Sequence, residues 1–342
     1  MKRLICAVLL SALLLSGCTA AGNTVPEKKQ YNATFLTLFD TVTTIVGKAE
    51  SEEAFRQMAQ QVHDELLVYH QLFDIYNDYE GVNNLKTIND NAGIAPVTVD
   101  RKVIDLLLDC KEFYSVTAGK VNVAMGSLLH LWHVARNDSI HNPAKAYLPD
   151  QTALEKTLFH CNINDLIIDE AASTVYLSDP EMRLDVGAIA KGWAVEQVTK
   201  TAPSGLLISV GGNVRATGPK EEGTPWVVGI QDPRQADQYL HTLYLTQGSL
   251  VTSGDYQRTY MVDGEAYHHI IDPLTLYPSQ YWSSVTIVCT DSGLADALST
   301  ALFLMDQQSG QALLDQFDAE ALWVDREGNL YYSPGFEEFI RT

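Results

Sequence analysis

The chain of 342 residues contains little cysteine and has no surplus of positive charge, and each shortage excludes a class of protein. Beyond the N-terminal segment only Cys110, Cys161 and Cys289 remain, and three widely spaced cysteines make neither a zinc site nor a disulfide framework. We interpret them as small buried hydrophobic residues. Lys and Arg number 23 against 43 Asp and Glu, which gives a formal charge of −20. Because a nucleic-acid-binding surface must neutralise phosphates, this balance argues against nucleic acid as a partner.

The composition is that of a folded globular protein. Apolar residues make up 46% of the chain and charged residues 19%. A disordered chain would have a much lower apolar fraction, and a membrane transporter a much higher one. The length predicts roughly two domains or one large one. No fixed repeat and no long linker interrupts the chain after Tyr31.

The N-terminal segment resembles a bacterial lipoprotein signal. Lys2 and Arg3 precede an apolar run, residues 4–15, that is too short to span a bilayer permanently. The run leads into Leu-Ser-Gly-Cys, which is similar to a lipobox, the motif in which the cysteine thiol receives a diacylglycerol before cleavage. We therefore expect Cys18 to be lipidated and the protein to be attached to the extracytoplasmic face of the cell membrane. An ordinary signal peptide with an accidental cysteine is the alternative.

This assignment divides the chain into three parts. Residues 1–18 are expected to be the signal peptide. Residues 19–30 are polar, include Pro26 and lack periodicity, so we expect a flexible tether. Residues 31–342 are expected to form the folded domain.

Hydrophobic spacing in the folded part predicts helices separated by short strands. The expected helices are residues 50–69, residues 100–115, a segment from near Ala188 to before Gly205, and a segment carrying Leu294, Leu298, Ala301, Leu302 and Met305. The expected strands are residues 166–169, 174–177, 206–210, 226–230, 258–262, 266–271 and 285–288. Asp263-Gly264 predicts a tight hairpin turn. The pattern predicts an α+β protein with mixed sheets and flanking helices, either one unit or two lobes that share a cleft.

Two glycine-containing segments could hold a ligand. Residues 183–193 predict a strand that ends in Asp185, a glycine turn, and a helix whose first turns carry Lys191. Such a helix start offers backbone N–H groups and an ammonium to an anion such as a phosphate; a capped helix with a structural Asp185 is the alternative. The paired glycines in residues 209–214 allow close approach of a ligand, or simply form a tight turn.

Two further clusters carry groups suited to acid–base or metal chemistry. His268 and His269 end an expected strand and point to opposite faces, so one can face a cleft as a general base; a structural role is the alternative. Asp296 and Thr300 lie four residues apart on an expected helix, about 5 to 6 Å apart at Cβ and within reach of one Mg²⁺. Alternatively, Asp296 lies near the helix start and Thr300 bonds to its own helix.

Together and in this order, these clusters resemble the ApbE family of FAD:protein FMN transferases. The similarity runs from about Phe39 to Phe303. The agreeing stretches lie within residues 117–132, 184–192, 210–213, 225–233, 252–256, 269–273 and 295–302.

The resemblance implies an ApbE-like fold and the transfer of FMN from FAD to a threonine hydroxyl of an acceptor protein through a phosphodiester bond, with AMP released and Mg²⁺ required. It implies Mg²⁺ ligation by Asp296, Thr300 and the main-chain carbonyl of Ala188, and it makes His269 the candidate for activating the hydroxyl. The implied FAD contacts are Phe39, Tyr76, Val123, Ala124, Met125, Asp185, Lys191 and Ile270. The implied acceptors are exported or membrane flavoprotein subunits of respiratory electron-transfer complexes, such as sodium-pumping NADH:quinone oxidoreductases.

Other functions and some departures from the family pattern stay open at this point. A Mg²⁺-dependent FAD pyrophosphatase would use water in place of the threonine, and a non-catalytic FAD-binding lipoprotein would release no AMP. The chain has Phe39-Asp40-Thr41 where the family often has Met-Gly-Thr, and Asn122 where an aspartate is common. It also has Leu276 where the family usually has a glycine, so that turn must form without one.

Overall fold

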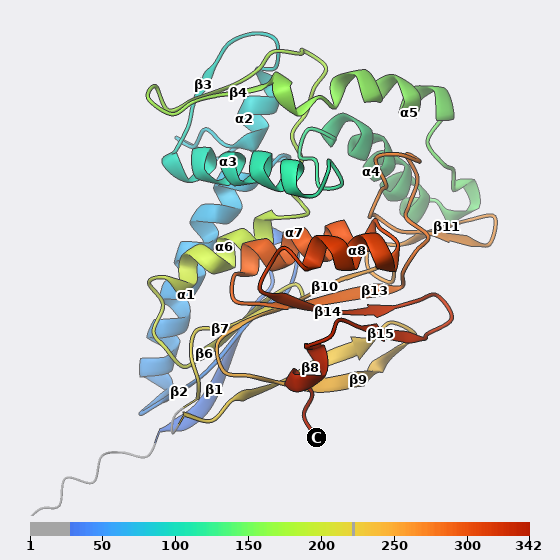
Figure 1. The fold of residues 1–342 in the computed structure, drawn as a ribbon. Helices are drawn as coiled ribbons and strands as arrows, with labels where there is room; N and C mark the ends of the chain where they lie inside the picture. The colour runs from blue at the N-terminus through green and yellow to red at the C-terminus, as the bar shows by residue number, and fades with distance from the viewer. Residues whose placement is uncertain (1–27, 221–222) are drawn as a thin grey trace, which may run out of the picture.

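The computed structural model describes residues 28–220 and 223–342. Its largest element is an eight-stranded sheet with the order β1-β2-β6-β7-β10-β13-β14-β15, in which all neighbouring strands are antiparallel (Figure 1). The strands are β1 (Lys29–Phe35), β2 (Thr43–Ala49), β6 (Leu206–Val210), β7 (Asn213–Ala216), β10 (Gly248–Gly254), β13 (Ser284–Cys289), β14 (Ala319–Val324) and β15 (Leu330–Tyr332). Among the strands described, parallel pairing is limited to one isolated bridge between Met125 and Arg183.

Both faces of this sheet are covered. Four helices pack on one face, and the hairpin of β8 (Trp226–Asp232) and β9 (Gln235–Leu245) covers part of the other, as Figure 1 shows. The helices are α1 (Glu52–Phe73), α6 (Ala190–Thr199), α7 (Ser292–Phe303) and α8 (Gln307–Leu314). Alternate residues of β13 explain the arrangement, because Val285 and Ile287 lie in the core under the helices and Val288 in the core over the hairpin.

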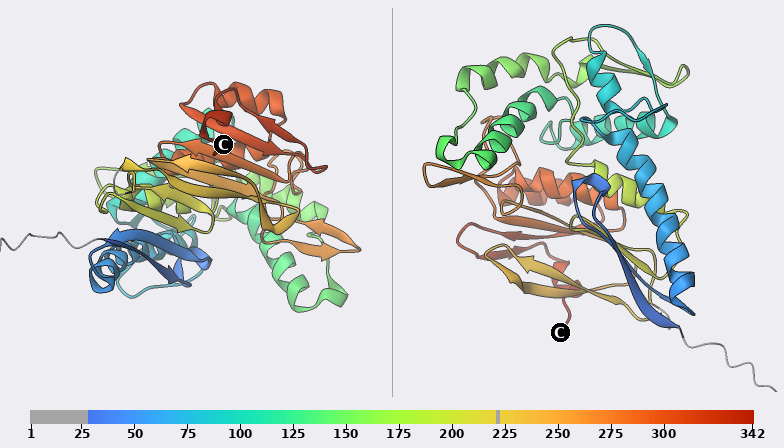
Figure 2. Two further views of the ribbon diagram at one scale, coloured as in Figure 1. Left: turned by 90° about the horizontal axis from the view of Figure 1, so that it is seen from below. Right: turned by 180° about the vertical axis from the view of Figure 1, so that it is seen from behind.

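A second, mainly helical layer lies beyond α6 and α7 (Figures 1 and 2). It contains α2 (Leu85–Asp90), α3 (Arg101–Val116), α4 (Gly126–His141), α5 (Gln151–Thr157) and a small sheet of β3 (Val97–Thr98), β5 (Thr174–Leu177) and β4 (Leu166–Asp169). A hairpin of β11 (Tyr260–Val262) and β12 (Glu265–Tyr267) packs against α4. One cluster of buried residues extends from α3 through α6 and α7 to β14, so the two layers share a continuous core.

The four expected helices are present as α1, α3, α6 and α7, and the Asp263-Gly264 turn joins β11 to β12. Helix α4 was not expected. Its buried positions recur at helical spacing, but several of them are Gly, Ala or Ser, which weakens the hydrophobic signal. Of the cysteines, Cys110 and Cys289 are buried as expected, and Cys161 is only partly buried.

Two local expectations were wrong. The strand expected over residues 266–271 ends at Tyr267, and His268 and His269 follow it. The side chain of His268 accepts a hydrogen bond from the amide of Ile270, which takes that amide out of a strand ladder. The segment before Asp185 belongs to no sheet and makes only the isolated bridge at Arg183.

The N-terminal expectations lie mostly outside the described residues. The signal peptide, Cys18 and the tether as far as residue 27 are not described, and β1 begins at Lys29, within the last residues of the expected tether. Within the described part of the chain, no helix combines the length and apolarity needed to cross a bilayer.

Candidate active site

A cavity of about 510 Å³ lies between the helical layer and the sheet. Helix α4 contributes to it from the helical layer, and β10 and α7 contribute from the sheet layer. Of the candidate site residues from the sequence, those that line it are Tyr76, Val123, Met125, Asp185, Ala188, Lys191, His268, His269, Ile270, Asp296 and Thr300. Tyr76 and Thr300, which are 224 positions apart in the chain, therefore line the same cavity.

Helices α6 and α7 pack closely where Asp296 lies. The carboxylate of Asp296 is buried, and its Oδ2 accepts a hydrogen bond from the backbone amide of Gly192 at 2.9 Å. The ammonium of Lys191 is 3.5 Å from the same oxygen. None of the described residues donates a hydrogen bond to Oδ1 of Asp296, so this oxygen remains available to a ligand.

The two other expected metal ligands have free oxygens. In a regular helix the amide of Gly192 would bond to the carbonyl of Ala188, four residues earlier. Because the Gly192 amide donates its hydrogen bond to Asp296 instead, no described residue donates a hydrogen bond to the Ala188 carbonyl. The hydroxyl of Thr300 also makes no hydrogen bond to a described residue. The alternative considered for Thr300 was a hydrogen bond from its hydroxyl to a carbonyl of its own helix. Ser299 makes such a bond instead, to the carbonyl of Asp296 at 2.9 Å.

The adjacent histidines differ in the way that the sequence predicts. His268 is buried, and its Nε2 donates to the carbonyl of Ser279 at 2.8 Å while its Nδ1 accepts from Ile270. Both of its nitrogens are occupied, so it is a neutral structural residue. His269 is partly buried, and its Nδ1 lies 3.2 Å from the carbonyl of Gln257. A carbonyl can only accept, so Nδ1 carries the proton and Nε2 is the free nitrogen.

The protonation of His269 is strongly biased. Burial lowers the pKa of His269 to about 3, and the positive charges of Arg258 and Lys191 add to the effect. Its ring is therefore neutral at physiological pH, with the unprotonated Nε2 able to accept a proton.

Segment 123–125 and Asp185 are connected through the backbone. The amide of Asp185 donates to the carbonyl of Val123 at 2.9 Å, and Asp185 Oδ1 accepts from the amide of Gly187 at 2.8 Å. Burial raises the pKa of Asp185, and the hydrogen bond from the Gly187 amide opposes that rise. Val123 and Met125 line the cavity, whereas Ala124 is fully buried between them and is not among the lining residues.

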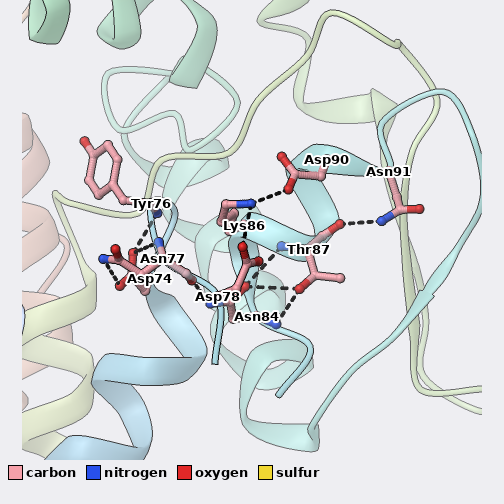
Figure 3. Close-up of polar contacts among 9 residues, drawn as sticks. All are labelled: Asp74, Tyr76, Asn77, Asp78, Asn84, Lys86, Thr87, Asp90 and Asn91. Carbon is pink, nitrogen blue, oxygen red and sulfur yellow. Dashed lines mark hydrogen bonds and ion pairs between the residues drawn. The ribbon is translucent and has the colours of Figure 1, made fainter. Parts of the chain in front are cut away.

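Tyr76 follows helix α1 in a turn that fixes its backbone. Asp74 Oδ1 accepts the amides of Tyr76 and Asn77, and a wider polar network around Asn84 and Lys86 holds the loop (Figure 3). The ring of Tyr76 stacks on His133 with centroids 5.0 Å apart. Burial raises the pKa of Tyr76 to about 12, with a further contribution from Asp185.

Phe39 lies beside the cavity but is not among the lining residues, whereas Asp40 and Thr41 are. Phe39 and Asp40 both adopt positive φ, 52° and 51°, and the ring of Phe39 contacts His70 edge-on. A second departure from the family pattern is also visible in the backbone, because Leu276 takes the left-handed φ of 64° that a glycine would adopt without strain.

Sequence reasoning missed several residues that line the cavity. Arg136 and Arg258 contribute guanidinium groups, and Asn213 contributes an amide. Asn213 is 1% exposed, and its Nδ2 has no hydrogen-bond partner among the described residues. A buried donor without an acceptor is costly, so this atom is suited to a polar ligand or an ordered water. In the sequence, the only indication that Asn213 could be a site residue was its place directly after the glycine pair. Nothing in the sequence indicated Arg136.

The fold and cavity define an α+β protein with a pocket suited to a phosphate-bearing substrate and a hard cation. The chain belongs to the ApbE family, whose model matches residues 39–323. It is 34% identical over 284 residues to the FAD:protein FMN transferase of Klebsiella pneumoniae (strain 342), covering 79% of this chain and 86% of that protein. It is 34% identical over 278 residues to the FAD:protein FMN transferase of Treponema pallidum (strain Nichols), covering 75% of each.

Solved structures share the fold. The ApbE protein of Thermotoga maritima superposes with a TM-score of 0.81 at 30% identity, covering 92% of this chain and 100% of that chain. The flavin transferase ApbE from Vibrio cholerae superposes with a TM-score of 0.75 at 23% identity, covering 92% of this chain and 100% of that chain, and it supports the fold alone.

The donor set fits Mg²⁺. Asp296, Thr300 and the Ala188 carbonyl are hard oxygen donors with free lone pairs on the wall of one cavity. Mg²⁺ is typically held by one or two carboxylates and completes its octahedron with waters and substrate phosphates. The described residues contain no group of three or more His, Cys, Asp or Glu side chains suited to a metal.

Proposed function

We propose that this protein transfers FMN from FAD to a threonine hydroxyl of an acceptor protein and releases AMP. One observation carries the proposal: the free oxygens of Asp296, Thr300 and Ala188 share a cavity with the free Nε2 of His269. A cation site next to an unprotonated base suits attack by a hydroxyl on a diphosphate. The names of the Klebsiella and Treponema relatives support the same activity.

The reaction forms one phosphorus–oxygen bond, breaks another and moves one proton. The threonine oxygen attacks the phosphorus on the FMN side of the diphosphate, and the bond from this phosphorus to the bridging oxygen breaks. That oxygen leaves with AMP, and the hydroxyl proton passes to Nε2 of His269. A positioned base contributes about 10²- to 10⁴-fold to such a step.

A pKa near 3 makes His269 a weak base but keeps it neutral. Its contribution therefore depends on its fixed position, which the bond from Nδ1 to the Gln257 carbonyl provides. A bound diphosphate would oppose the charges of Arg258 and Lys191, which removes part of the cause of the low pKa.

Three residues would hold Mg²⁺ here: Asp296 through its carboxylate, Thr300 through its hydroxyl and Ala188 through its carbonyl. A divalent cation at this place would neutralise diphosphate charge and fix its orientation. Lys191 would lie beside the same phosphates, since its ammonium is 3.5 Å from Asp296. The remaining expected contacts, Tyr76, Val123, Met125, Asp185 and Ile270, would line the flavin nucleotide site.

The test compares transfer with hydrolysis. The protein is incubated with FAD, Mg²⁺ and an acceptor domain, and the acceptor is measured by intact mass spectrometry while AMP is quantified. An FMN adduct with equal AMP supports transfer. Free FMN with no adduct would instead show a FAD pyrophosphatase, and bound FAD without AMP would show a non-catalytic carrier.

Two histidine variants sharpen this test. His269→Gln should lose adduct formation by about 10²- to 10⁴-fold while retaining FAD binding. His241→Gln removes a histidine that bonds to Tyr332 outside the cavity, and it should transfer FMN at the unchanged rate. Equal activity of the two variants would remove His269 from the mechanism.

We also propose that the protein acts from a lipid anchor at Cys18 on the extracytoplasmic face of the cell membrane. The Leu-Ser-Gly-Cys sequence after the apolar run supports this. Exported or membrane flavoprotein subunits of respiratory electron-transfer complexes are the proposed acceptors. Cys18→Ser should abolish labelling by radioactive fatty acid and release the protein from the membrane fraction; unchanged labelling would contradict the anchor.

A further inference from the structure

The cavity carries four side-chain cations besides its histidines, and they are not equivalent. The set is Lys120, Arg136, Lys191 and Arg258. Lys120 forms an ion pair with Asp272 at 3.2 Å, and Lys191 forms one with Asp296 at 3.5 Å. The ammonium groups are thus already matched by carboxylates.

The two arginines have no such partner among the described residues. Among the described residues, Arg136 hydrogen-bonds only to neutral groups, His133 Nδ1 at 3.3 Å and Asn137 Oδ1 at 3.4 Å. Arg258 makes neither a hydrogen bond nor an ion pair with any described side chain, although its positive charge acts to lower the pKa of Asp185. In a chain with 43 acidic residues and 23 basic ones, two unmatched guanidinium groups in one cavity are unexpected.

The arginines also oppose one another. The pKa of Arg136 is lowered by burial and next by the charge of Arg258, so the two guanidinium groups repel across the cavity. Arg258 adopts a φ of 49°, a conformation that residues other than glycine rarely take. A disfavoured backbone and a repulsion between like charges both fit a site built for an anion.

We propose that Arg136 and Arg258 form an oxyanion subsite for a phosphate of FAD, separate from the cation site at Asp296 and Thr300. This inference rests on the proposed function. A FAD diphosphate carries two negative charges, and the planar fork of a guanidinium matches phosphate oxygens with paired hydrogen bonds. Arg258 follows Gln257, whose carbonyl orients His269, so a phosphate bound by Arg258 would lie near the ring of His269.

The neighbours of Arg136 fit the same ligand. His133 lies between Arg136 and the ring of Tyr76, with which it stacks. Aromatic faces beside a guanidinium suit a planar ring attached to a phosphate. A carboxylate of the acceptor protein has the same charge and could also bind guanidinium, and the experiment distinguishes these two sources.

The experiment measures binding of FAD and of riboflavin, which lacks phosphate, to the protein by flavin fluorescence with a chelator present and no acceptor. Arg136→Met and Arg258→Met should each weaken FAD binding about tenfold or more and leave riboflavin binding unchanged. Arg258→Lys should restore part of the affinity. Arg101→Met, which removes a surface arginine paired with Asp105 and Glu170, is the matched control and should bind FAD normally.

Each other outcome overturns the proposal. Unchanged FAD affinity with weaker acceptor saturation would assign the arginines to an acceptor carboxylate. Equal loss of FAD and riboflavin binding, or a lower unfolding temperature than that of the Arg101→Met control, would make them structural. Absence of FAD binding in the unmodified protein would overturn the proposed function itself, whereas FAD binding that the substitutions leave intact would overturn only the arginine subsite.

Discussion

The backbone amide of Gly192 donates its hydrogen bond to the side chain of Asp296 on a neighbouring helix, at 2.9 Å, in place of the carbonyl four residues earlier. This hydrogen bond links α6 to α7, orients the carboxylate and leaves the Ala188 carbonyl free. The two helices approach so closely that a Cβ at Gly192 would lie 2.2 Å from the Ser292 carbonyl oxygen and 2.5 Å from Asp296 Cβ. The candidate cation site depends on that contact.

Gly192→Ala is therefore expected to separate α6 from α7. Overpacking of this kind costs about 1 to 3 kcal/mol of unfolding free energy, which urea titration measures. Gly310→Ala is the matched control, because a Cβ there would make ordinary contacts, the nearest at 3.5 Å to Leu302. Equal stability of the two variants would contradict the close packing at Gly192.

Asp296→Asn should keep the bond from Gly192 but remove the charge. Losing the carboxylate from a metal site is expected to lower AMP release by about a hundredfold or more, with Mg²⁺ affinity falling in a calorimetric titration. Asp291 is the N-cap residue of the same helix, and its side chain accepts a hydrogen bond from the Leu294 amide. Asp291→Asn is the control and should leave AMP release intact. A fully active Asp296→Asn protein would exclude this residue as a metal ligand.

Thr300→Val keeps the shape of the side chain and deletes only the oxygen. We expect the Mg²⁺ concentration for half-maximal AMP release to rise about tenfold, a size typical of changes to groups that support a metal. The neighbouring hydroxyl of Ser299 bonds to the Asp296 carbonyl and to Ser253, so Ser299→Ala should lower stability without changing the Mg²⁺ requirement. The reverse pattern would assign the metal to Ser299.

The pH dependence of kcat/KM follows from the low pKa of His269. A histidine with a pKa of about 3 keeps its proton-accepting form as pH falls, so its ionisation should cause no loss of kcat/KM from about pH 8 to about pH 5. Rates of AMP release at saturating Mg²⁺ across this range provide the measurement. A tenfold decline with an apparent pKa near 6.5, absent in His269→Gln, would show that the histidine titrates normally.

Much of the site was predictable where spacing along one element fixes geometry. Asp296 and Thr300 share a helix face because they lie four residues apart, and adjacent histidines were expected to face opposite ways. Both histidines line the cavity, but His268 is buried with both ring nitrogens bonded, whereas His269 is only partly buried and keeps Nε2 free. The ordered motifs also predicted the family, which the match over residues 39–323 confirms.

Other features depend on contacts that no local pattern encodes. Arg136 lies on α4, whose hydrophobic signal is weak, and it lines the same cavity as Arg258 because α4 packs against the β11–β12 hairpin. The freedom of the Ala188 carbonyl is decided by a hydrogen bond across 104 positions of the chain. Asn213 has an unsatisfied amide only because the surrounding fold buries it.

The amino-acid sequence by itself determined the main helices and the order of chemically active groups, because these follow from composition and from spacing within one segment. Only the tertiary structure decided which oxygens stay free, which histidine nitrogen carries the proton and which cations lack a partner. Each of those depends on where hydrogen bonds and charges from distant segments meet once the chain has packed.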